Sequence, residues 1–208
     1  CQLAGPDEFR ELARVVREEC GRATRIQAAL RGRCGRRRAG AAQAEEAPDC
    51  IADAEKLAPF NPTPDCAIAQ ALDALRVGPG DVVYDLGCGD GRFLLAAARR
   101  GARGVGVEYD RRFADRARLA AREAGAGEAI DVLHGDACAV DLAPATKIFV
   151  YLVPTGLRLL VARLEDALRR NVPIASYTFS LPALAPSEVL SADTRSPECK
   201  VYVYRRAE

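Results

Sequence analysis

The sequence lacks methionine, even at position 1, and has no apolar run of the ~18 residues that a membrane-spanning helix needs. The missing methionine indicates a fragment, a processed product or a trimmed chain whose true start is unknown. The missing apolar run excludes a transmembrane segment from the sequence given. We therefore expect a soluble protein.

Metal-binding residues are also scarce. The only histidine is His134, and none of the eight cysteines forms a C-x-x-C pair. A zinc site of the usual spacing is therefore not expected, and we predict no metal. Isolated thiols are typical of a reducing compartment, which predicts an intracellular location.

Charge of one sign is not in excess either. The 30 basic and 29 acidic side chains leave a net charge of +1. This balance argues against a protein that binds nucleic acid mainly by electrostatic attraction. The 208 residues, of which 49% are hydrophobic, are enough for one domain with a sizeable core and exclude disorder of the whole chain.

The residue pattern divides the chain near position 57. Residues 7–31 carry apolar side chains at three- and four-residue spacing, which predicts an amphipathic helix. Residues 32–49 combine Gly, Ala and charge without apolar periodicity and are interpreted as a linker. We therefore expect a helical extension and linker over 1–56 and one folded domain over 57–208.

Strand and helix patterns alternate after residue 57. This alternation predicts an α/β fold, Rossmann-like, with an open sheet of mostly parallel strands and helices on both faces. The last strand has the clean alternation of an antiparallel one. The expected helices cover 65–76, 91–100, 111–125 and 157–170, and the expected strands cover 82–87, 104–110, 130–136, 147–153, 171–179 and 199–206.

The strongest motif is DLGCGDGR, residues 85–92, which links a strand to a helix. Glycines at alternate positions let the backbone turn sharply and approach a ligand closely. A dinucleotide loop would need glycine where Arg92 stands, and the GK[ST] of a P-loop is absent. The preceding acid, Asp85, suits a cationic amine better than a pyrophosphate, which favours S-adenosylmethionine.

Two further acids follow strand ends. Glu108 lies 23 positions after Asp85, where a carboxylate accepts hydrogen bonds from ribose hydroxyls. Asp136 follows the third strand and is placed to accept from an adenine amino group, with Ala137 beside it. Parallel strands bring their carboxyl ends to one edge, so the three acids predict a nucleoside site.

Together these residues resemble the class I S-adenosylmethionine-dependent methyltransferases, over roughly residues 57–206. The family's fold is a seven-stranded sheet with an antiparallel last strand. The resemblance implies that Glu108 and Tyr109 bind the ribose side of S-adenosyl-L-methionine and that Asp136 and Ala137 face its adenine. The residues that it implies for the methionine end are Asp85, Leu86, Gly87, Cys88, Gly89 and Gly91.

The segments PFNPTP (59–64) and YLVP (151–154) resemble those of the small protein-lysine methyltransferases of mitochondria and their prokaryotic relatives. The [DNS]PP[YFW] of nucleobase and glutamine N-methyltransferases is missing from the second segment. The resemblance implies a protein substrate with a target lysine, such as the ATP synthase c subunit or the adenine nucleotide translocator, and a mitochondrial location. It makes Phe60 and Tyr151 candidate walls of a lysine channel, and Thr63 a candidate cover over the amino-acid end of the cofactor.

Other interpretations stay open. A basic helix with Arg111, Arg112, Arg116, Arg118 and Arg122 is compatible with an RNA acceptor, and a small-molecule acceptor is a further alternative. A non-catalytic binding or scaffold module, or less readily a nicotinamide-dependent dehydrogenase, shares the fold type. His134 is a tempting general base, but its position inside a strand favours a structural role. The target protein, the degree of methylation and the oligomeric state stay undetermined.

Overall fold

The computed structural model describes residues 61–191 and 199–206. The helix predicted over 7–31, its linker and Phe60 lie outside the described residues, and the division near residue 57 stays a prediction.

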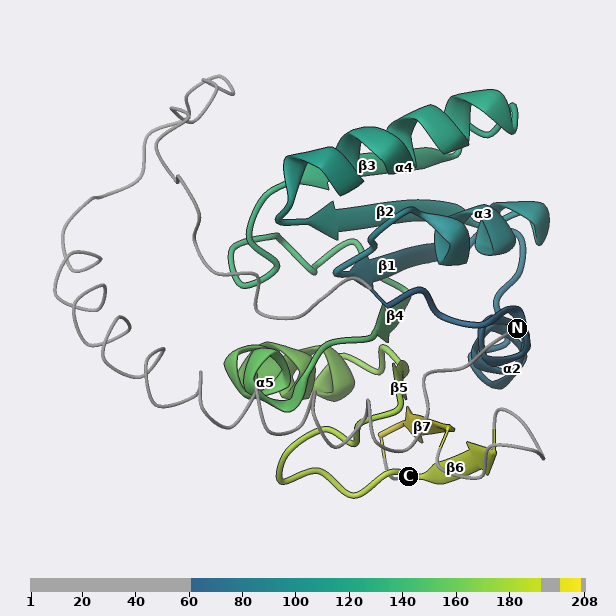
Figure 1. Ribbon diagram of the computed structural model, residues 1–208. Helices are drawn as coiled ribbons and strands as arrows, with labels where there is room; N and C mark the ends of the chain where they lie inside the picture. Colours follow the sequence, from purple (N-terminus) through teal and green to yellow (C-terminus); the bar gives the residue numbers. More distant parts are fainter. Residues whose placement is uncertain (1–60, 192–198, 207–208) are drawn as a thin grey trace, which may run out of the picture. The chain divides into compact units, whose positions relative to one another are not determined.

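The described residues form a seven-stranded sheet in the order β3-β2-β1-β4-β5-β7-β6. β3, β2, β1, β4 and β5 pair in parallel, and β7 runs antiparallel to both of its neighbours. Figure 1 shows the arrows of β1 and β2 pointing the same way. The predicted α/β class and the antiparallel last strand are confirmed. The strands are β1 (Val82–Leu86), β2 (Arg103–Glu108), β3 (Ile130–His134), β4 (Lys147–Val150), β5 (Ile174–Tyr177), β6 (Glu188–Ser191) and β7 (Lys200–Tyr204).

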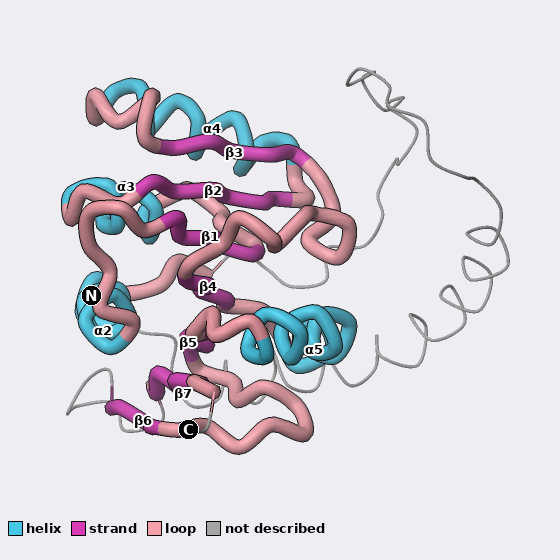
Figure 2. Tube along the Cα trace, turned by 180° about the vertical axis from the view of Figure 1, so that it is seen from behind, coloured by secondary structure: helices cyan, strands magenta, loops and turns pink. Residues whose placement is uncertain are grey.

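Helices cover both faces of this sheet. The helices are α2 (Asp65–Ala74), α3 (Arg92–Arg99), α4 (Arg111–Glu123) and α5 (Pro154–Arg169). Apolar side chains of α2 and α3 pack with Val83 and Phe149, whereas those of α5 pack with Leu86 and Val150. Successive strand residues point to opposite faces, so one strand supplies both cores. Figure 2 shows α5 on the opposite side of the strands from α2 and α3.

The centre of the sheet is its most buried part. In β1 every residue from Val83 to Leu86 is buried, as expected for a parallel strand that is covered on both faces. Phe93 of α3 stacks on Phe149 of β4 with ring centroids 3.9 Å apart. This packing fixes the helix that follows the glycine motif against the neighbouring strand.

Some element boundaries differ from the sequence-based expectation. The strand expected over 147–153 ends at Val150, and α5 begins at Pro154 rather than at Leu157. Proline at the first helical position lacks only an N–H that has no helical partner, so the helix can begin there. The strand expected over 130–136 ends at His134. Asp136 and Tyr151 therefore lie just beyond strands. β6 was not predicted at all.

The close approach between β2 and the glycine motif gives a stability prediction. A Cβ at Gly106 would lie 2.6 Å from both Cys88 Sγ and Leu94 Cδ1. Gly106→Ala should therefore lower the free energy of unfolding by about 1–3 kcal/mol through overpacking, as measured by urea denaturation. Gly78→Ala is the matched control, because a Cβ at Gly78 would have no heavy atom within 4 Å. Equal denaturation midpoints for the two variants would contradict this packing.

Candidate active site

Residues from neighbouring strands meet at the carboxyl edge of the sheet. Leu86 of β1 is paired with Val107 of β2 and with Val150 of β4, and Val150 is paired with Ser176 of β5. The residue that follows each of these along the chain lies one step further along the same edge. The residues at that level are Gly87, Glu108, Tyr151 and Tyr177.

The glycine loop folds back onto β2. The amide N–H groups of Gly87 and Cys88 both donate to the carbonyl oxygen of Val107, at 2.8 and 3.1 Å. Gly87 and Gly91 have φ values of 90° and 78°, a region that other residues rarely adopt. A Cβ at Gly87 would also lie 2.8 Å from Leu152 Cδ2. The loop therefore needs glycine here both for its dihedral angles and for its packing against the segment after β4.

Leu86, just before Gly87, and Cys88, between Gly87 and Gly89, have buried side chains. Leu86 belongs to the core beneath α5, and Cys88 packs with α3 and α4. Burial is the main cause that raises the pKa of the Cys88 thiol. Both side chains point into the core, so these two residues offer a ligand their backbone groups.

Glu108 connects the end of β2 to the glycine loop. Its Oε2 accepts from the Gly89 amide at 2.9 Å, and its Oε1 accepts from the Asp110 amide at 2.9 Å. A carboxylate has about four acceptor positions, so each oxygen keeps capacity for another donor. This geometry suits two ribose hydroxyls.

Asp85 is the acid most removed from water. Its side chain is 3% exposed. Burial raises its pKa well above the usual range, and the nearby charges of Glu108 and Asp90 add to the effect. Asp90 is ion-paired with Arg92 at 2.7 Å. Asp85 and Glu108 thus leave a negative region that a cationic ligand would stabilise, and the ammonium and sulfonium of S-adenosylmethionine fit it.

The adenine side of the predicted site is more open. Asp136 is exposed, and its Oδ1 accepts from the Cys138 amide at 2.8 Å, while Ala137 is partly buried. Tyr109 exposes 53% of its surface. The structure thus brings Tyr109, Asp136 and Ala137 to loops after adjacent strands, next to Glu108.

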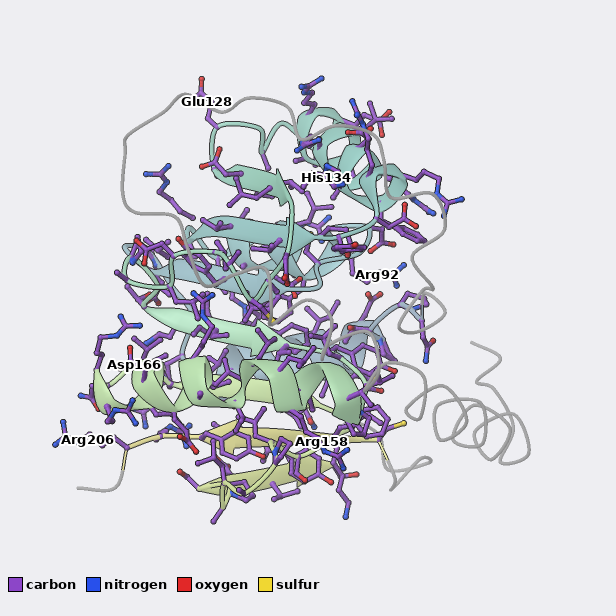
Figure 3. The ribbon with its side chains drawn as sticks, turned by 90° about the vertical axis from the view of Figure 1, so that its left-hand side faces the viewer. Arg92, Glu128, His134, Arg158, Asp166 and Arg206 are labelled. Atoms are coloured by element: carbon purple, nitrogen blue, oxygen red, sulfur yellow. The ribbon has the colours of Figure 1, made fainter. Side chains whose placement is uncertain are left out.

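His134 stands away from the acceptor side. It pairs with Glu108 across β3 and β2, and its Nε2 lies 3.2 Å from the Tyr109 carbonyl oxygen. Three strand spacings separate β3 from β4, or about 14 Å. His134 is therefore too far from Tyr151 to act as a general base at that end of the site. Figure 3 shows His134 above Arg92 in the view towards this edge.

The segment before α2 contacts both the glycine motif and the end of β4. Thr63 is buried, and its carbonyl oxygen accepts from Arg92 Nη1 at 3.4 Å. Two residues earlier, Asn61 Nδ2 donates to the Tyr151 hydroxyl at 3.0 Å. Residues 61–63 therefore reach from the glycine loop to the end of β4, where we predicted Thr63 and Tyr151 to act.

Tyr151 does not stand alone at that end. Its ring meets that of Tyr177 edge to face, with centroids 4.8 Å apart. Burial raises the pKa of both phenols, so both are neutral at physiological pH. We did not predict Asn61 or Tyr177 as site residues. Tyr177 was detectable in the sequence, because it lies two residues before the end of the strand expected over 171–179, as Glu108 does in the strand expected over 104–110.

The strand order, the glycine loop and the two acids at one sheet edge define a class I S-adenosylmethionine-dependent methyltransferase. The family model described as "ANTKMT methyltransferase domain" matches residues 85–188, half of the chain. The chain belongs to this family, and its cofactor is S-adenosyl-L-methionine.

Similar proteins carry different acceptor names. A protein-lysine N-methyltransferase of Saccharolobus islandicus is 29% identical over 70% of this chain and 92% of its own length. The adenine nucleotide translocase lysine N-methyltransferase of Mus musculus is 34% identical over 61% of this chain and 56% of its own length. A solved RNA methyltransferase from Salinibacter ruber, in complex with S-adenosyl-L-homocysteine, is 35% identical over 71% of this chain and 95% of its own, with a TM-score of 0.66.

The ribose assignment is tested at Glu108. Glu108→Gln replaces one acceptor oxygen by an NH2 group, which opposes a backbone N–H and removes a ribose acceptor. Affinity for S-adenosylhomocysteine should fall by about 1–3 kcal/mol, measured by titration calorimetry. Glu123→Gln, on the exposed end of α4, is the control. Equal affinity in all three proteins would refute the placement of the ribose.

Replacing Asp85 by asparagine should have opposite effects on stability and on cofactor binding. An acid whose pKa is raised by folding destabilises the folded state as pH rises above its unfolded pKa, ~3.9. Asp85→Asn should therefore raise the free energy of unfolding of the ligand-free protein at pH 7 by about 0.5–2 kcal/mol, and weaken S-adenosylhomocysteine binding. The stability gain should shrink towards pH 4. A gain that persists undiminished at pH 4 would show that charge burial is not its cause.

Proposed function

We propose that this methyltransferase transfers methyl groups to the side-chain amine of a lysine in a protein. The observation that carries the proposal is the neutral aromatic pair, Tyr151 and Tyr177, beside the glycine loop. The lysine-specific names of the Saccharolobus and mouse relatives support it, the former over nearly its whole length.

The chemistry of the acceptor end suits an amine. When bound, S-adenosylmethionine supplies a methyl group that is already activated by the sulfonium. The protein must therefore orient an amine that has lost its proton, against a free lysine pKa of ~10.4. Aromatic walls at the partly buried Tyr151 and the buried Tyr177 favour the neutral amine by desolvation. The Tyr151 hydroxyl, which already accepts from Asn61, offers the amine an oriented hydrogen-bonding partner.

RNA is the alternative that the name of the Salinibacter structure raises. Three of the five arginines of α4, the candidate RNA surface, form ion pairs with acids of the same helix and its cap. Arg111 and Arg118 pair with Asp115, and Arg112 pairs with Asp110. Phosphate binding needs unneutralised basic groups in number, and the whole chain carries a net charge of only +1. These pairs favour a protein acceptor.

The partner that this proposal implies is a protein with an accessible lysine. In the described ranges, no helix combines the length and apolarity that crossing a bilayer requires. A mitochondrial location, which the family resemblance implies, stays a prediction.

The proposal is tested by transfer of labelled methyl groups. The purified protein is incubated with labelled S-adenosylmethionine and a cell extract, with Asp85→Asn as the control for cofactor dependence. The products are then divided between protease and nuclease digestion. Label released by protease and recovered as methyl-lysine after hydrolysis is the expected result. Label released by nuclease alone, or found only in small molecules, would overturn the lysine assignment.

Tyr151→Phe separates acceptor from cofactor binding. Removing the hydroxyl takes one hydrogen bond from the acceptor end and leaves the ring in place, so kcat should fall about tenfold, equivalent to ~1.4 kcal/mol. Affinity for S-adenosylhomocysteine should not change. Tyr202→Phe, a partly buried tyrosine of β7, is the control. Full activity of Tyr151→Phe would remove this hydroxyl from the site.

A further inference from the structure

The turn after β5 has an unusual backbone at Thr178. Its φ is 66°, in the left-handed region. A β-branched side chain is strongly disfavoured there, because Cγ2 and Oγ1 crowd the backbone. Arg76, Asn171 and Ala183 share the region but are not β-branched. Thr178 is therefore the described residue at which positive φ conflicts most with side-chain shape.

Hydrogen bonds on both sides hold this turn. The Phe179 amide donates to the Tyr177 carbonyl oxygen at 2.8 Å, which closes a γ-turn around Thr178. The Thr178 amide donates to the Lys200 carbonyl oxygen of β7 at 2.7 Å, and the buried Ser176 hydroxyl donates to the Phe179 carbonyl oxygen at 2.6 Å. Because three hydrogen bonds fix this turn, Thr178 can be held in a strained backbone conformation.

Thr178 directly follows Tyr177 and is partly buried next to the aromatic pair. Burial raises the pKa of Tyr151 and of Tyr177, and hydrogen bonding with the Thr178 side chain acts in the opposite direction on both. Independently of titration, the two rings lie 4.8 Å apart and the turn follows Tyr177 directly. Asn61 approaches the Tyr151 hydroxyl from the other side at 3.0 Å.

We infer that Thr178 is a positioning residue, whose hydroxyl, with Asn61, fixes the direction in which the Tyr151 hydroxyl faces the acceptor amine. The inference rests on the proposed function for the nature of the acceptor. If the turn were the only requirement, glycine would be the more stable residue, because it adopts this φ at no steric cost. A glycine, however, has no hydroxyl to offer the two tyrosines. The strained residue is therefore explained by its side chain.

Three substitutions at Thr178 separate the hydroxyl from the backbone. Thr178→Ser keeps the hydroxyl and removes the β-branch, Thr178→Val keeps the shape and removes the hydroxyl, and Thr178→Gly removes both. Ala183→Gly is the matched control, since Ala183 has a φ of 61° and is exposed away from the strand ends. Each variant is measured for thermal midpoint, for S-adenosylhomocysteine affinity, and for kcat and KM with the acceptor that the wild-type enzyme labels.

The expected pattern divides activity from stability. Thr178→Gly should melt a few degrees higher than wild type yet lose about tenfold in kcat, and Thr178→Val should show the same loss of kcat. Thr178→Ser should retain kcat within about twofold. Affinity for S-adenosylhomocysteine should not change in any variant. Ala183→Gly should retain full kcat.

A purely structural role for Thr178 would give a different result. Wild-type kcat in Thr178→Val or Thr178→Gly would overturn the inference, and so would a loss of kcat in Thr178→Ser equal to that in Thr178→Val. If the wild-type enzyme labels RNA instead of lysine, the proposed function fails, and the same series measured with RNA still decides the role of Thr178.

A spectroscopic measurement decides the inference without an acceptor. Alkaline ultraviolet titration identifies the Tyr151 phenol as the one missing from Tyr151→Phe. Loss of the Thr178 hydroxyl should raise the pKa of this phenol in Thr178→Val, because a hydrogen bond that favours the ionised form is removed. An unchanged titration curve would show that the two hydroxyls do not interact.

Discussion

The hydrogen bond from the Gly89 amide to the Glu108 carboxylate, 2.9 Å long, is the interaction on which the rest of the site depends. It fastens the middle of the glycine loop to the end of β2, and the Gly87 and Cys88 amides fasten its start to the same strand. Glu108 thereby stabilises the loop and keeps acceptor capacity that suits a ribose. Because the loop is held before any ligand binds, little ordering cost is left for the cofactor to meet.

The site has two halves that depend on different parts of the fold. The ends of β1, β2 and β3 form the predicted cofactor half, where burial and the neighbouring acids raise the pKa of Asp85. The ends of β4 and β5 form the proposed acceptor half, whose phenols are neutral. Residues 61–63 join the halves through Arg92 and Tyr151. A change in this segment would therefore affect both halves, because Asn61 holds the Tyr151 hydroxyl and the Thr63 carbonyl oxygen holds Arg92.

The sequence predicted the cofactor half better than the acceptor half, for physical reasons. The loop of residues 85–92 and the acids after β2 and β3 follow from local pattern, because parallel strands must end at one edge. The contact between Asn61 and Tyr151 joins residues 90 positions apart, and no periodicity encodes it. β6 was not predicted, because Glu188–Ser191 is short and mostly exposed and its apolar and polar residues do not alternate clearly. Threonine rarely adopts the left-handed backbone region, so residue preferences did not predict the turn at Thr178.

Relatives named for protein lysine and for RNA are similar to this chain over 70% and 71% of its length, so overall likeness does not choose the acceptor. The choice must come from groups that contact the acceptor. A phosphate backbone needs several free cations, whereas a single amine needs an aromatic wall, exclusion of water and one oriented acceptor. At the ends of β4 and β5 the described residues supply Tyr151, Tyr177 and Asn61, which are all uncharged. Arg92, at the start of α3, is ion-paired with Asp90. These uncharged groups suit a neutral amine better than a polyanion, and this electrostatic difference is the ground on which we propose lysine rather than RNA.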